Sequence, residues 1–111
     1  MSDAYYDPSH LENFREVGKN RPELAEKFFD YYSEVMGEGA LTRREKTLIA
    51  LAVAHAVQCP YCIDGYTKGA LEAGADLDQM TEAMHVATAI RSGATLVHGM
   101  QMREHHDRLS M

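Results

Sequence analysis

Two cysteines, Cys59 and Cys62, are the residues of this sequence best suited to chemistry. Only Pro60 and Tyr61 separate them, in the pattern Cys-x-x-Cys. Proline suits the first turn of a helix, so we expect Cys59 at an N-cap and Cys62 in the first turn. Free backbone N–H groups and the helix dipole stabilise a thiolate there, and two sulfurs at this spacing can close into a disulfide. The pattern therefore predicts a reactive, reversible dithiol.

Two ring-bearing side chains lie one helical turn from the dithiol. His55 precedes Cys59 by four residues, and Tyr66 follows Cys62 by four. An imidazole can take up or return a proton near neutral pH, whereas a phenol donates a hydrogen bond but is a poor base there. A core histidine bonded to a carbonyl and a packing tyrosine are the structural alternatives. Both residues are therefore candidates for catalysis.

Glu45 is the acidic candidate, and it lies upstream of His55 on the same predicted helix. A helical wheel puts Glu45 on the face of His55 and Cys59. The intervening helix spans roughly 21 Å, so contact with Cys59 requires the next helix to fold back, a water chain or a neighbouring subunit. Thr42 and Glu45 also have the spacing of a capping box. A catalytic and a capping role both remain open for Glu45.

Zinc is the chemical alternative to a redox dithiol. His55, Cys59 and Cys62 could supply three ligands, with His85 or His98 as a fourth. The sequence contains no second Cys-x-x-Cys and no His-x-x-x-His, which structural zinc sites commonly use. The pattern therefore favours a dithiol without a metal or other cofactor.

Apolar spacing is helical along the whole chain. Proline, glycine and capping residues divide it into five predicted helices. The first three are Ser9–Gly18 with Ser9 as N-cap, Pro22 to about Met36, and Thr42 to Val57. The fourth runs from Tyr61 to Ala73 with Gly74 as its stop, and the fifth from Leu77 or Asp78 to about His106 with a bend near Ser92–Gly93. We expect a single all-α domain over residues 1–111, a bundle of about five or six helices with the Cys-x-x-Cys motif at the start of a central helix. Faces rich in alanine and glycine favour subunit packing.

Composition and charge restrict the partners. Apolar residues make up 45% and charged residues 25%, which is typical of a globular chain. The net charge of −6 argues against nucleic-acid or anionic-membrane binding. No apolar run is long enough to cross a membrane and no secretory leader opens the chain, so a cytoplasmic location is expected. Residues 41–70 alone are net positive, which favours a thiolate at the cysteines.

Three stretches of the sequence resemble the carboxymuconolactone decarboxylase family, in particular its alkylhydroperoxidase D-like branch. They are LTRREKTLIALAVA from Leu41, CPYC from Cys59 and GALEAGA from Gly69. The similarity covers about residues 40–95. It implies an all-helical fold, a homotrimer or homohexamer, and reduction of hydroperoxides by the cysteine pair.

The resemblance also implies roles for single residues. The second cysteine of the branch attacks the peroxide and the first resolves the sulfenic acid, which maps to Cys62 and Cys59. The branch usually has a relay histidine four residues after the second cysteine, where this sequence has Tyr66. We therefore expect His55 to manage the proton, with Tyr66 and Glu45 as helpers. A dithiol protein or a small thiol must then reduce the disulfide.

One more departure concerns the acidic residue. The branch has a glutamate about twelve residues before the first cysteine, and this sequence has Thr47 there, with Glu45 as the nearest acid. The sequence thus predicts a cofactor-free thiol peroxidase acting on a hydroperoxide. The alternative is a non-enzymatic redox sensor or a zinc-holding helical module.

Overall fold

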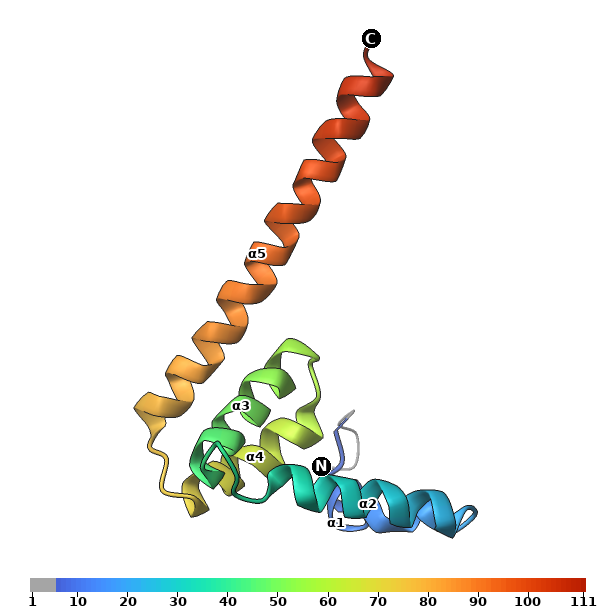
Figure 1. Cartoon of the computed structure of the whole chain (residues 1–111), viewed down its shortest axis with the longest axis vertical. Helices are drawn as coiled ribbons and strands as arrows, with labels where there is room; N and C mark the ends of the chain where they lie inside the picture. Colours follow the sequence, from blue (N-terminus) through green and yellow to red (C-terminus); the bar gives the residue numbers. More distant parts are fainter. Residues whose placement is uncertain (1–5) are drawn as a thin grey trace.

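The computed structural model describes residues 6–111, and every regular element in that range is a helix (Figure 1). The elements are α1 (Pro8–Glu12), the 3-10 helix η1 (Phe14–Gly18), α2 (Pro22–Met36), α3 (Arg43–Ala56), α4 (Pro60–Glu72) and α5 (Leu77–Leu109). The predicted all-α class is confirmed.

The core lies where α3 meets α4 and the first turns of α5. Its buried members are Leu51, Ala70, Ala75 and Met80, against which Leu48 and Tyr66 pack. Alanine at Ala70, which is fully buried, allows the helices to approach closely. This small core fixes α3 and α4 relative to each other, and these are the two helices that carry the candidate site residues.

Local signals set the ends of these helices as expected. Thr42 and Glu45 form the capping box at the start of α3, and Cys59 is the N-cap of α4. Gly74, with φ of +91°, follows the end of α4 in the left-handed region, where glycine is at no disadvantage. The predicted bounds of α2, α3 and α4 are therefore confirmed to within one or two residues.

The predicted helix Ser9–Gly18 is wrong in two respects. Asp7, not Ser9, is the N-cap, because its carboxylate accepts the backbone N–H of Ser9 at 3.0 Å and Pro8 occupies the first helical position. The α-helix then ends at Glu12, and a 3-10 helix follows.

Helix α5 differs from the prediction in length and shape. It runs for 33 residues without a break at Ser92–Gly93, and its outer part projects away from the other helices instead of closing a bundle (Figure 1). No other part of the chain packs closely against Gly93, so no neighbouring element bends the helix there. Within residues 6–111, no helix combines the length and the apolar character needed to cross a membrane.

Candidate active site

The two cysteines meet at the start of α4. The Sγ atom of Cys59, the N-cap, accepts the backbone N–H of Cys62 at 3.4 Å, and both thiols are free. Gln58, with φ of 58°, turns the chain from α3 into α4, and the N–H of Cys59 bonds to the carbonyl of Ala54 at 3.0 Å. The backbone therefore holds both sulfurs at one helix N-terminus, as the sequence predicts.

The two sulfurs have opposite electrostatic environments. A hydrogen bond from the Cys62 thiol, followed by backbone N–H groups, lowers the pKa of Cys59. Burial, followed by the interaction with Cys59, raises the pKa of Cys62 to about 11. Cys59 is therefore the sulfur that ionises more readily, and Cys62 is the one that keeps its proton more firmly.

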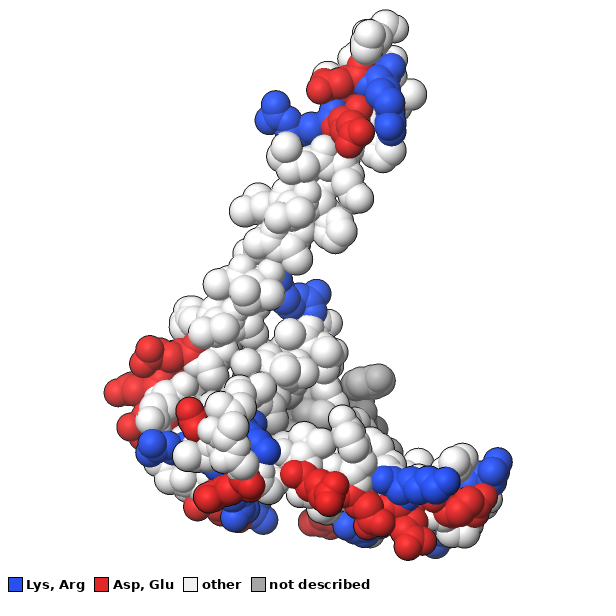
Figure 2. Space-filling model, viewed as in Figure 1, with Lys and Arg blue, Asp and Glu red and all other residues white. Residues whose placement is uncertain are grey.

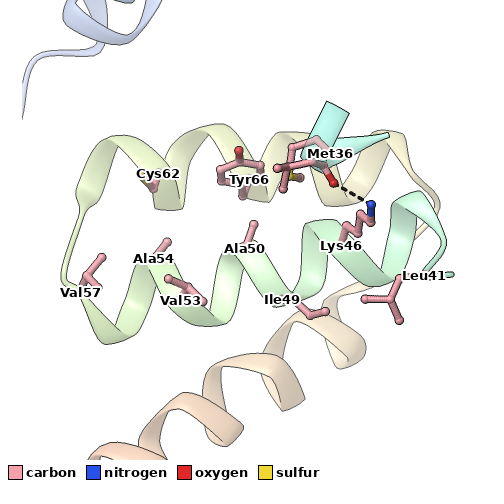
Figure 3. A pocket seen from close by; sticks show the side chains of 11 residues that line it. Met36, Leu41, Lys46, Ile49, Ala50, Val53, Ala54, Val57, Cys62 and Tyr66 are labelled. Atoms are coloured by element: carbon pink, nitrogen blue, oxygen red, sulfur yellow. Dashed lines mark hydrogen bonds between the residues drawn. The ribbon is translucent and has the colours of Figure 1, made fainter. Parts of the chain in front are cut away.

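Cys62 and Tyr66 separate two cavities. The first has a volume of about 570 Å³ and lies mainly along α3, with apolar walls (Figure 3). The second, of about 530 Å³, is bounded by α1, η1 and α2 as well as α4. Its aromatic lining consists of Phe14, Phe28, Phe29, Tyr32, Tyr61 and Tyr66. A small molecule can therefore reach Cys62 from either side of α4.

Tyr66 lies beside Cys62 one turn along α4 (Figure 3). Burial raises the pKa of its phenol, so the hydroxyl stays protonated and serves as a hydrogen-bond donor at neutral pH. Thr47, at the position of the branch's glutamate, is 4% exposed. Its hydroxyl donates to the carbonyl of Arg44 at 2.8 Å. Thr47 is thus an internal packing residue of α3.

His55 faces away from this arrangement. Its Nδ1 lies 2.8 Å from the carbonyl oxygen of Leu51, and because a carbonyl only accepts, Nδ1 carries the proton. His55 lines neither cavity that Cys62 lines, and among the described contacts it bonds to neither sulfur. This is the geometry of a core histidine bonded to a backbone carbonyl. A catalytic role for His55 stays a prediction.

The geometry changes which of two substitutions we expect to lower the peroxide-reduction rate more. A lost general base would lower the peroxide-reduction rate of His55→Gln by about 10–1000-fold, but the position of His55 leads us to expect less than about tenfold. Tyr66→Phe should cost about 10–100-fold, because a hydrogen bond to a charged group contributes about 1.5–3 kcal/mol. Initial rates of peroxide consumption with a dithiol reductant measure both, and circular dichroism controls for folding. A larger loss in His55→Gln would restore His55 as the base.

Glu45 is engaged at the opposite end of α3. Its carboxylate accepts the backbone N–H of Thr42 at 2.7 Å, and the Thr42 hydroxyl accepts the N–H of Glu45 at 3.1 Å. The hydrogen bond from the Thr42 backbone lowers the pKa of Glu45. Glu45 is exposed and lines neither cavity beside Cys62. Its capping role is established, and a catalytic role would need another subunit.

Two variants separate capping from catalysis at Glu45. Glutamine also completes a capping box, so Glu45→Gln should keep both stability and peroxide reduction if capping is the only role. Glu45→Ala removes half of the capping box and should lower the urea midpoint of unfolding, measured at fixed protein concentration. A catalytic carboxylate would show itself if Glu45→Gln lost activity at unchanged stability.

Lys46 is a site residue that the sequence analysis missed. Its side chain lines the first cavity (Figure 3). Its ammonium group donates to the carbonyls of Val35 at 2.7 Å and Gly37 at 2.5 Å. These bonds tie the C-terminal end of α2 to α3, so Lys46 positions one wall of the cavity. No local pattern signals such a contact, because its partners lie nine and eleven residues away.

The ligand set of the zinc alternative is not assembled in the part of the chain that the structure describes. No three His, Cys, Asp or Glu side chains within residues 6–111 come together in a geometry that could hold a metal ion. His85 and His98 both lie on the exposed surface of α5.

The described chain is all-helical and carries two free cysteines at the N-terminus of a central helix. Residues 22–103 match the carboxymuconolactone decarboxylase family, and the chain belongs to this family. It is 42% identical over 83 residues, 75% of each chain, to uncharacterized protein 4 in the cox locus of Paracoccus denitrificans.

Two crystal structures share the fold. A protein from Methanobacterium thermoautotrophicum is 38% identical, with a TM-score of 0.73 over 81% of this chain and 98% of that one. A carboxymuconolactone decarboxylase family protein from Legionella pneumophila, in its apo form, is 28% identical, with a TM-score of 0.67 over 81% of this chain and 85% of that one.

Proposed function

We propose that this chain is a thiol-dependent peroxidase of the alkylhydroperoxidase D-like branch, which reduces hydroperoxides through a dithiol–disulfide cycle of Cys59 and Cys62. The observation that carries the proposal is the paired sulfurs at the start of α4, with Cys62 lining two cavities and the pKa of the Cys59 thiol lowered by its neighbours. Membership of a family that includes such peroxidases supports it.

The first chemical step joins Cys62 to the distal oxygen of the peroxide. The Cys59 thiolate takes the proton of the Cys62 thiol as the Cys62 sulfur attacks and the O–O bond breaks. The leaving alkoxide takes this proton from Cys59 and departs as the alcohol, so Cys62 becomes a sulfenic acid and Cys59 is again a thiolate. Cys59 thereby acts as the base that the missing relay histidine would supply, and the Tyr66 hydroxyl can donate to the developing charge.

The second step closes the disulfide. The Cys59 thiolate attacks the sulfur of the Cys62 sulfenic acid, and hydroxide leaves and is protonated to water. The net reaction converts one hydroperoxide and two thiols into an alcohol, water and a disulfide. An external dithiol then reduces the disulfide, and Cys59 is the more exposed sulfur for its attack. No cofactor takes part.

Counting thiols before and after one equivalent of hydroperoxide tests the proposal. We expect two free thiols to fall to none, with a mass loss of two protons per chain and no covalent dimer. Repeated consumption of peroxide in the presence of a dithiol reductant should follow. Oxidation without catalytic turnover would favour the redox-sensor alternative, and predominant links between chains would contradict the intramolecular disulfide.

A further inference from the structure

Beyond Arg91, which donates to the carbonyl of Ala56 at the end of α3, the outer part of α5 packs against nothing that buries it in a single chain. No side chain after Ala87 is buried on this helix, and Ile90, Leu96, Val97 and Met100 are each 65–76% exposed. Arg91 is the only charged residue in segment 83–102, which forms an almost uncharged shaft below a charged tip (Figure 2). Large apolar residues lie on every side of this segment, between neutral polar ones such as Thr88, Thr95 and Gln101. An extended run of exposed apolar side chains marks an interaction surface, so segment 83–102 points to a partner.

The dimensions of the chain indicate how much surface that partner covers. The accessible surface is 8945 Å², whereas a folded monomer of this mass has about 6,100 Å². The radius of gyration is 18.7 Å, compared with about 13 Å for a compact domain of this length. The excess of roughly 2,800 Å² is in the range that obligate oligomers bury. An interface of this size favours a permanent partner, such as a second copy of the chain.

The first cavity offers an apolar surface that matches this shaft. Ile49 and Val53 of α3 and its C-cap Val57 recur every four residues, line the cavity and are each at least half exposed. No carboxylate lines this cavity, and its one charged group, Lys46, is bound to two carbonyls. The rim formed by Ile49, Val53 and Val57 is therefore open, apolar and uncharged, and it borders the cavity that Cys62 lines.

We propose that segment 83–102 of α5 from a second copy of this chain lies across this rim and completes the wall of the cavity that Cys62 lines. Within one chain, Met80 and Ala87 are the buried residues of α5. Val86, Ile90 and Val97 lie on a different side of the helix and are free to meet the second copy. Each active site is then enclosed by two subunits. The proposal concerns the cavity rather than the reaction, so it stands independently of the peroxidase assignment.

Cross-linking between differently tagged subunits tests this contact. In a Cys59→Ser/Cys62→Ser background, one subunit carries Val53→Cys and a co-expressed one carries Val97→Cys. A short bismaleimide should join the two chains through residues 53 and 97, as peptide mapping would show. Glu26→Cys, on the exposed surface of α2, replaces Val97→Cys as the control and should give no link. Links only between two copies of residue 97, or a monomer of 12.4 kDa by light scattering, would overturn the proposal.

A charge placed on the shaft gives a second readout in the protein with its native cysteines. Val97→Glu should reduce the mass of the assembly and raise the alkylation rate of Cys62 by at least about threefold, because the cavity opens to solvent. His106→Glu places the same charge in the charged tip and should change neither. An unchanged mass and alkylation rate in Val97→Glu would refute the contact. If Val97→Glu unfolds, the cross-linking experiment still tests whether segment 83–102 contacts the rim of a second copy.

Discussion

Cys62→Ser is expected to lower peroxide consumption by about 1,000-fold or more, on the scale of losing a catalytic nucleophile. A serine hydroxyl is not ionised at neutral pH and cannot form a sulfenic acid or a disulfide. Cys59→Ser should also abolish turnover, because both the resolving sulfur and the proton acceptor of the first step are lost. This variant should still accumulate a sulfenic acid on Cys62 after one equivalent of peroxide, which dimedone labelling and mass spectrometry would detect.

The pair of variants also decides which sulfur attacks. Lys68→Gln, on the exposed side of the same helix, is the matched control and should retain full activity. If Cys62→Ser forms a sulfenic acid on Cys59 and Cys59→Ser forms none, the roles of the two sulfurs are exchanged. The lowered pKa of Cys59 makes this the alternative to exclude.

The parts of the fold that sequence reasoning predicts correctly depend on neighbours in the chain. The capping box of Thr42 and Glu45 and the left-handed Gly74 require only local geometry. The start of α1 is harder, because Asp7 and Ser9 can both cap a helix, and the position of Pro8 decides between them. The projection of α5 is not predictable from its own pattern, because large apolar residues spread around its outer part do not indicate which side packs within its chain.

The same distinction holds for the candidate site. The Cys59–Cys62 hydrogen bond and the adjacency of Cys62 and Tyr66 follow from helical spacing. Spacing also puts His55 one turn from Cys59, but it does not reveal that Nδ1 takes the Leu51 carbonyl as its partner. The cavity wall at Lys46 depends on tertiary contacts, which no short pattern encodes.

Iodoacetamide is expected to label Cys59 at least about tenfold faster than Cys62 at neutral pH. The pKa of Cys59 is lowered from 9.0 whereas that of Cys62 is raised to about 11. A difference of two or more pKa units leaves at least about 100 times more thiolate on Cys59. The weaker nucleophilicity of the more acidic thiolate offsets about six- to tenfold of this advantage. Timed alkylation followed by peptide mass spectrometry measures the ratio.

The pH dependence of the two labelling rates shows whether the pKa of each cysteine is raised or lowered. The midpoint of the rate increase at Cys59 should lie below pH 9, whereas the rate at Cys62 should keep rising toward about pH 11. In Cys59→Ser the pKa of Cys62 should fall, because the hydrogen bond and the charge of Cys59 are removed, but it should stay above 9.0, because burial is the largest cause of its shift. Equal labelling of both cysteines across the pH series would contradict a thiolate at the N-cap. It would also remove the internal base on which the first chemical step depends.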